Sequence, residues 1–333
     1  MKLRLLPLHE QVMVITGASS GIGLVTARHA AARGASVVLV ARNQHDLKNA
    51  VEHIRDRGGR AIDVVADVAD AQAVERVADA AIAEFGRINT WVNNAAVSMY
   101  GRVTQLTIDD MRRQMDVNYW GQVYGSIVAV RHLRRYGGAL INVGSALCDR
   151  AIPLQGNYCA AKHALKAFTD ALRMELEEEG VPISVTLVKP ASVDTPFFEK
   201  AKTYLGVEPQ PVPPVYAPEV VSDVILEASQ RPIRELIAGG SGAKLSAARF
   251  VPRLADLYME RSTFDSQRTA TPTNGRPDNL YQPMADDGGE RGRHWTGHTR
   301  GSSLYTQAFL RPGAAATVCT ALAVGLVLAR RYS

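Results

Sequence analysis

A glycine-rich turn near the amino terminus restricts the fold of this chain more than any other feature. A short apolar run, Val12–Ile15, leads into the sequence TGASSGIG at positions 16–23, and a helical pattern follows. Gly17 allows a tight turn, Gly21 lets the backbone approach a phosphate group, and Gly23 permits close contact between helix and strand. The helix N-terminus then faces the phosphates. The pattern predicts a strand–turn–helix unit that binds the pyrophosphate of a dinucleotide.

Apolar runs rich in β-forming residues recur along the first 240 residues, with helical patterns between them. They are Val12–Ile15, Val37–Val40, Ala61–Val65, Thr90–Val92, Ala139–Val143, Ile183–Val188 and Glu235–Ala238. Strands that alternate with helices favour a mainly parallel sheet covered by helices on both faces. We therefore predict an α/β, Rossmann-type doubly wound domain over residues 1–240, with ligand binding beyond the carboxyl ends of the strands.

A tyrosine and a lysine, Tyr158 and Lys162, are four residues apart in a helical pattern, thirteen positions after Ser145. Side chains at this spacing share one helix face, so the ammonium can lie beside the phenol ring. A tyrosine hydroxyl with a pKa of about 10 is a poor acid or base at neutral pH unless a positive charge stabilises its phenolate. The pair predicts proton transfer to or from a substrate oxygen that the Ser145 hydroxyl also contacts.

These segments occur in an order that resembles the short-chain dehydrogenase/reductase family over roughly residues 8–240. The glycine loop, Asp67-Val68 and Asn93–Ala96 match the family's motifs in that order, although Ala96 stands where the family usually has glycine. Another small departure is Pro190-Ala191 in place of a frequent Pro-Gly. The resemblance implies the strand order 3-2-1-4-5-6-7 and a homodimer or homotetramer.

The resemblance also implies which residues form the site. The catalytic positions are Asn118, Ser145, Tyr158 and Lys162. The cofactor-binding positions are Gly17, Ser19, Ser20, Gly21, Ile22, Gly23, Arg42, Asp67, Val68, Asn94, Tyr158, Lys162, Pro190, Val193 and Thr195. By the same resemblance Lys162 lowers the pKa of Tyr158 and holds the nicotinamide ribose, and Asn118 holds a water that connects Lys162 to solvent.

The end of the second predicted strand, Ser36–Ala41, indicates which nicotinamide cofactor is used. In NAD enzymes of this kind an acidic residue at that point binds the ribose hydroxyls and repels a 2′-phosphate. This chain has Ala41 there, followed by Arg42. The guanidinium fork suits a phosphate dianion in geometry and charge, so the sequence favours NADP(H) over NAD.

The resulting hypothesis is an oxidoreductase that moves hydride between NADP(H) and a carbonyl or secondary alcohol. Apolar residues after Ser145 and after the sixth strand favour a lipophilic substrate, namely Leu147, Ile152, Pro153, Leu154, Phe197, Phe198 and Tyr204. A catalytically silent NADP-binding sensor and a membrane-tethered scaffold are the alternatives. Such silent proteins commonly lose a member of the Ser-Tyr-Lys set, and this chain keeps all three.

Composition excludes some classes of function. The net charge of +5 comes from 38 basic and 33 acidic residues, and most of the excess lies after residue 260. The catalytic region lacks a basic stripe with interleaved aromatics, which argues against nucleic-acid binding. Three cysteines without metal-type spacing, and an apolar start broken at Pro7, favour a reduced cytoplasmic compartment, no secretory signal and no metal site.

The C-terminal extension divides into three parts by composition. We predict an amphipathic helix over residues 241–262. For residues 263–310 we predict an irregular basic linker. Residues 311–333 predict an apolar helix, in which Gly313–Ala329 is a run without charge. That run is just short for a bilayer, so membrane association and packing against a subunit surface both stay open.

Overall fold

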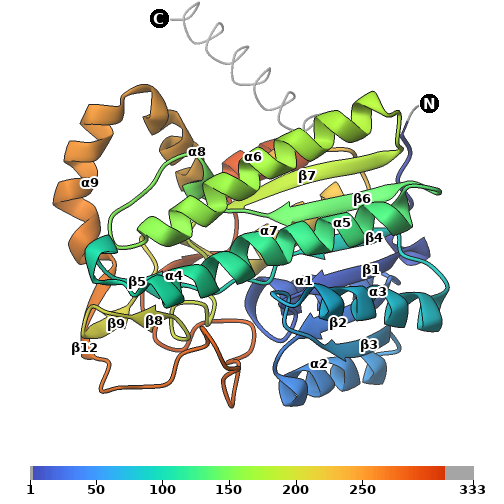
Figure 1. Cartoon of the computed structure of the whole chain (residues 1–333), viewed down its shortest axis with the longest axis horizontal. Coiled ribbons are helices and arrows are strands. Elements are labelled where there is room, and N and C mark those ends of the chain that lie inside the picture. The colour runs from blue at the N-terminus through green and yellow to red at the C-terminus, as the bar shows by residue number, and fades with distance from the viewer. Residues whose placement is uncertain (1–2, 312–333) are drawn as a thin grey trace, which may run out of the picture.

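A parallel sheet of seven strands forms the centre of the computed structural model, which describes residues 3–311 (Figure 1). The strands are β1 (Val12–Thr16), β2 (Ser36–Ala41), β3 (Arg60–Val65), β4 (Thr90–Asn93), β6 (Gly138–Val143), β7 (Ile183–Pro190) and β11 (Glu235–Ala238). Their order across the sheet is β11-β7-β6-β4-β1-β2-β3. Counted along the chain, this is the order 3-2-1-4-5-6-7, so the predicted Rossmann-type fold is confirmed.

Helices cover both faces of the sheet. They are α1 (Gly21–Ala32), α2 (Gln44–Asp56), α3 (Ala71–Phe85), α4 (Ile108–Met115), α5 (Gly121–Leu133), α6 (Gly156–Glu178) and α7 (Pro218–Ala228). One apolar core joins the sheet to α1, α2 and α7, and a second joins it to α3, α5 and α6. Strands covered on both faces need apolar side chains in succession, which explains why every residue of β1 is buried.

The extension after β11 packs against the domain. Residues 241–262, predicted as one amphipathic helix, are divided between α8 (Gly240–Ala247), a 3₁₀ turn and α9 (Pro252–Ser266). The break is at Pro252, which has no N–H to donate to a preceding turn but fits the first position of a new helix. In Figure 1 α9 lies at the side of the molecule, beyond the carboxyl ends of the central strands.

Residues 263–310, predicted as an irregular linker, follow a defined path over the domain. The short strand β12 (Arg268–Pro272) pairs with β9 (Val207–Pro209), and β13 (Thr299–Arg300) pairs with β10 (Val215–Tyr216). Helix α10 (Leu304–Leu310) then packs on α7 and β11. Two further short strands, β5 (Met99–Tyr100) and β8 (Lys202–Thr203), pair with each other.

The predicted apolar helix over residues 311–333 lies outside the described residues, apart from Arg311. Within residues 3–311 no helix has the length and apolar character needed to cross a bilayer.

Candidate active site

A large cavity of about 1750 Å³ lies at the carboxyl ends of the central strands. Every predicted cofactor-binding residue except Gly23 lines this cavity, as do Ser145, Tyr158 and Lys162. The glycine loop forms one part of its wall and the reacting side chains another. The sequence therefore predicted a set of residues that the fold brings together at one site.

The glycine loop has the backbone that its sequence predicts. Gly17 and Gly21 have φ angles of +68° and +54°, a left-handed conformation that residues with a Cβ rarely adopt. A Cβ added to Gly23 would lie 2.2 Å from the carbonyl oxygen of Gly17. Gly23 thus lets α1 begin directly against the turn.

Hydrogen bonds between the end of β1 and the segment after β4 hold the glycine loop in place. The Thr16 hydroxyl accepts hydrogen bonds from the backbone N–H groups of Asn94 and Ala95, at 2.9 and 3.0 Å. The Asn94 side-chain amide donates to the carbonyl oxygen of Thr16 at 2.9 Å. Asn94 therefore holds the loop in shape as well as lining the cavity.

Tyr158 and Ser145 come from α6 and from the turn after β6. Ser145 caps a 3₁₀ turn by accepting a hydrogen bond from the backbone N–H of Leu147 at 3.1 Å. Tyr158 is only 8% exposed. Burial raises the pKa of the Tyr158 hydroxyl above its ordinary value, and a hydrogen bond with Ser145 opposes the shift only in part. The phenol is therefore protonated at neutral pH.

Lys162 is fully buried on the same helix as Tyr158. Its ammonium donates to the carbonyl oxygen of Val143 at 2.9 Å and lies 5.7 Å from the centre of the Tyr158 ring. Burial lowers the pKa of Lys162 to about 8, against the attraction of Cys148. Lys162 was expected to lower the pKa of Tyr158, but it is not among the groups that shift this pKa, and burial of the phenol is the largest cause of the shift.

Asn118 has a different environment from the one expected. It lies in a π-helical turn, Asp116–Trp120, between α4 and α5, and is fully buried outside the cavity lining. Its side-chain oxygen accepts from the N–H of Val97 at 2.8 Å, and its amide donates to the Val97 carbonyl at 2.9 Å. The Asn118 side chain thus holds the segment after β4 to this turn.

The apolar wall beside Tyr158 includes part of the predicted substrate set. Leu147, Ile152, Phe197 and Phe198 line the cavity. Pro153, Leu154 and Tyr204 do not, and the Tyr204 hydroxyl instead donates to Asp110. Helices α8 and α9 and the residues between them supply further lining residues that the sequence analysis did not place at the site, namely Leu245, Ala248, Val251, Leu254, Ala255, Tyr258 and Met259. Their amphipathic spacing was visible, but not the surface on which they pack.

Arg42 extends from the end of β2 along the cavity wall. Its guanidinium donates to the backbone carbonyl oxygens of Asn279 and Tyr281, the latter at 3.0 Å. Asp67 lies 3.9 Å from Arg42 and forms a closer pair with Arg113. A guanidinium has five N–H donors in a planar fork, so these two carbonyls leave other donors of Arg42 for a ligand.

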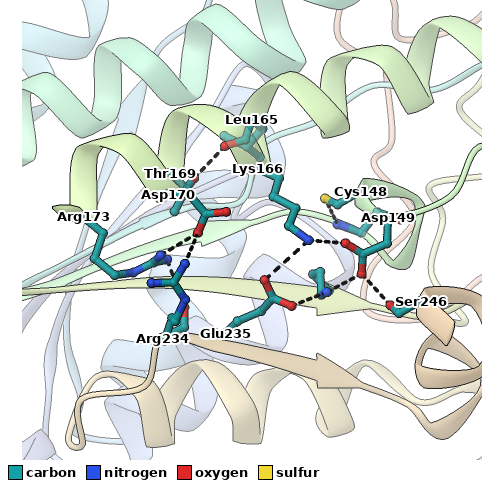
Figure 2. Close-up of polar contacts among 12 residues, drawn as sticks. Cys148, Asp149, Leu165, Lys166, Thr169, Asp170, Arg173, Arg234, Glu235 and Ser246 are labelled. Atoms are coloured by element: carbon teal, nitrogen blue, oxygen red, sulfur yellow. Dashed lines mark hydrogen bonds and ion pairs between the residues drawn. The ribbon is translucent and has the colours of Figure 1, made fainter. Parts of the chain in front are cut away.

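A buried group of charges anchors the turn that carries Ser145 and Leu147. Figure 2 shows the Asp149 carboxylate between Lys166 of α6 and Ser246 of α8, both of which donate to it. Lys189 of β7 donates to the same carboxylate. The Lys189 ammonium is 2.5 Å from Asp149 and also pairs with Glu235 of β11. The network joins four elements behind the apolar wall. Over residues 3–311, no group of three or more His, Cys, Asp or Glu side chains is placed to hold a metal ion.

Comparisons with known proteins agree with this geometry. The family model described as short chain dehydrogenase matches residues 11–205. The uncharacterized oxidoreductase YxnA of Bacillus subtilis (strain 168) is 44% identical over 325 residues, which cover 96% of this chain and 91% of YxnA. The 11-beta-hydroxysteroid dehydrogenase A of Sesamum indicum is 39% identical over 189 residues, which cover 56% of this chain and 53% of that protein.

Among solved structures, a short-chain dehydrogenase/reductase from Burkholderia phymatum in complex with NAD superimposes with a TM-score of 0.67 at 25% identity. The match covers 78% of this chain and 98% of that one. The family match over most of the domain, the long alignment with YxnA and the shared fold lead to one conclusion. The chain belongs to the short-chain dehydrogenase/reductase family of oxidoreductases.

Proposed function

We propose that the protein is an NADP(H)-dependent oxidoreductase that transfers hydride between the nicotinamide and a carbonyl or secondary alcohol of a lipophilic substrate. The observation that carries this proposal is that Ser145, Tyr158 and Lys162 share one cavity with the glycine loop. The lining of the same cavity extends from Arg42, at the end of β2, to the apolar side chains of α8 and α9. A binding protein without turnover would not need the complete reacting set.

In the proposed reaction the nicotinamide supplies or accepts the hydride, and the protein supplies alignment and the proton. Tyr158 donates its proton to the substrate oxygen during carbonyl reduction, while the Ser145 hydroxyl orients the same oxygen. The Lys162 charge offsets the negative charge that remains on Tyr158. Burial raises the pKa of the Tyr158 hydroxyl, and the protonated phenol is the form that donates a proton in carbonyl reduction.

The Lys162 charge predicts a pH limit on carbonyl reduction. We expect kcat to fall as pH rises through about 8, where the buried Lys162 ammonium loses its proton. Steady-state rates measured across this range test the expectation. Lys162→Arg keeps a charge at this site at all these pH values, so the fall should disappear from its profile. A flat profile for the wild type would contradict the role of the Lys162 charge.

The preference for NADP(H) rests on Arg42 and on the absence of an acid at Ala41. A charge-assisted contact between Arg42 and a 2′-phosphate contributes about 1.5–3 kcal/mol, or roughly ten- to a hundred-fold in affinity. Titration of the wild type should show this roughly ten- to a hundred-fold tighter binding of NADPH than of NADH. In Arg42→Ala the two affinities should be nearly equal. Equal affinity of the wild type for the two cofactors, or an Arg42→Asp variant that still preferred NADPH, would overturn the assignment.

A lipophilic substrate is proposed because apolar side chains surround Tyr158 and continue onto α9. The relative from Sesamum indicum, named as an 11-beta-hydroxysteroid dehydrogenase, is consistent with an apolar polycyclic ketone or alcohol. A panel of hydrophobic ketones and aldehydes, followed by NADPH absorbance, tests the proposal. Sugar phosphates serve as the contrasting class, and faster turnover of these than of every hydrophobic compound would reject it.

A homodimer or homotetramer is also part of the proposal. By the family resemblance, the helix that carries Tyr158 and Lys162 and the helix that contains Asn118 pack against a second subunit. Large apolar side chains are exposed on these helices, namely Trp120, Ile127 and Met174. Contact between copies of the chain would remove this surface from water.

A further inference from the structure

Residues 279–290 of the C-terminal extension run across the end of the cavity formed by the glycine loop and the start of α2. We call this segment the strap. Its first residues hold Arg42 through the backbone carbonyls of Asn279 and Tyr281. Further along, the Met284 carbonyl accepts a hydrogen bond from the Asn43 side chain at 2.9 Å. The strap is thus attached to the domain at the point where Arg42 lies.

The middle of the strap reaches the two serines of the glycine loop. The Asp287 carboxylate accepts a hydrogen bond from the Ser19 hydroxyl at 2.5 Å and lies 3.3 Å from the Lys200 ammonium. Lys200 in turn donates to the Ser20 hydroxyl at 2.7 Å. The side chains of Asp287 and Lys200 are only 9% and 11% exposed, so this ion pair is largely withdrawn from solvent.

The end of the strap contacts the beginning of α1. The backbone N–H of Gly21, one of the N–H groups that cannot be satisfied within the helix, donates to the Gly289 carbonyl at 2.8 Å. Arg28, about two turns further along α1, pairs with Glu290 at 2.5 Å. The strap therefore uses hydrogen-bonding groups of the very loop that the dinucleotide phosphates are expected to approach.

The strap forms a wall of the cavity and does not fill it. Asn279, Pro283 and Asp287 line the same cavity as the glycine loop, Arg42 and Tyr158. A dinucleotide bound along the loop would accordingly lie beneath the strap. The contacts of Asp287, Gly289 and Glu290 hold the strap in this position.

We propose that the strap is a gate of the dinucleotide site: it detaches from the glycine loop to admit or release the dinucleotide, and it closes over the loop at other times. This proposal rests on the proposed function, because it assumes that a nicotinamide dinucleotide binds in this cavity. It adds that residues 279–290 control the rate of cofactor exchange, with Asp287 as the main latch.

A gate has a kinetic signature that distinguishes it from two other roles. If only the open strap allows passage, then weakening the latch raises the rate constants of association and dissociation together. A strap that competes with the dinucleotide for Ser19 and Gly21 would, when weakened, raise association and tighten binding. A strap that only contacts the bound dinucleotide would, when weakened, raise dissociation alone.

Stopped-flow fluorescence of the full chain with NADPH, and in parallel with NADH, measures both rate constants. In Asp287→Ala both should rise roughly tenfold or more, since a charge-assisted latch of this kind is lost, while Kd changes several-fold at most. Glu290→Ala, which leaves Lys200 and Ser19 untouched, should raise both rate constants by a smaller factor. Thermal unfolding of each variant shows that it is folded.

Asp286→Asn is the matched control. Asp286 is the neighbouring acid of the strap, is exposed, and forms a hydrogen bond with Gly288 and an ion pair with Arg293, so its substitution should leave both rate constants within about twofold. Unchanged association in folded Asp287→Ala and Glu290→Ala would overturn the gate, whichever way Kd moved. Failure of the wild type to bind either cofactor would instead overturn the proposed function, so the two failures are distinguishable.

Discussion

Tyr158→Phe is expected to lower kcat for carbonyl reduction by at least about 10²-fold, and NADPH affinity by no more than roughly twofold. The change removes the proposed proton donor and its hydrogen bond with Ser145, while the ring keeps its place against Phe197, whose centre lies 6.0 Å away. Turnover of a hydrophobic ketone gives the first quantity and fluorescence titration with NADPH gives the second. Wild-type turnover by the folded variant would defeat the mechanism.

Tyr100→Phe is the matched control for this experiment. Tyr100 is fully buried close to Tyr158, and its pKa is also raised by burial, but it does not line the cavity. Removal of its hydroxyl should therefore leave kcat unchanged within about twofold and alter stability only slightly. An equal loss of turnover in both variants would mean that the hydroxyl of Tyr158 acts through packing and not through its proton.

The parts of the site that the sequence predicted are those with a local physical signal. The glycine loop could be found because Gly17, Gly21 and Gly23 each meet a backbone demand that only glycine satisfies. The pair of Tyr158 and Lys162 could be found because helical spacing places both on one face. The seven strands were predicted because strands covered on both faces appear as unbroken apolar runs.

The parts that were missed depend on contacts between distant segments without any periodic pattern. Arg42 meets Asn279 across 237 positions, and Ser19 meets Asp287 across 268. Residues 279–290 have a composition typical of a poorly ordered connection, and no local rule says that this segment crosses the glycine loop. The hydrogen bond from the Val97 N–H to the Asn118 side chain is a similar case. It depends on a π-helical turn that the sequence did not predict.

Asp149 is not among the predicted site residues, yet its replacement should have the largest effect on stability. Its side chain is 1% exposed and pairs with Lys166 and Lys189 (Figure 2). With Glu235, the network balances two positive charges by two negative ones. Asp149→Ala leaves an uncompensated positive charge behind the Ser145 turn. We expect the free energy of unfolding in urea to fall by about 3–5 kcal/mol at neutral pH.

The pH dependence of this loss has a definite sign. Burial acts to raise the pKa of the Asp149 carboxyl, but hydrogen bonds from Lys166, Lys189 and Ser246 outweigh burial and hold that pKa well below its ordinary value. A lowered pKa in the folded state stabilises the fold above the unfolded pKa of about 4, and the contribution is lost as pH falls further. The difference between wild type and Asp149→Ala should thus be constant from about pH 5 to 8 and narrow below about pH 4.

Asp256→Asn is the control for the Asp149 experiment. Asp256 lies on α9 and forms an ion pair with Arg150, the residue after Asp149, but its side chain is 46% exposed. Ion pairs at such partly solvated positions contribute about 0–1 kcal/mol, so this variant should unfold at nearly the wild-type urea concentration. Asp149→Asn separates charge from shape: it should lose nearly as much stability as Asp149→Ala, since the neutral amide fits the space but leaves the lysines unbalanced. If Asp149→Asn matched the wild type at every pH, the charge of the network would not be what fixes the turn beside the active site.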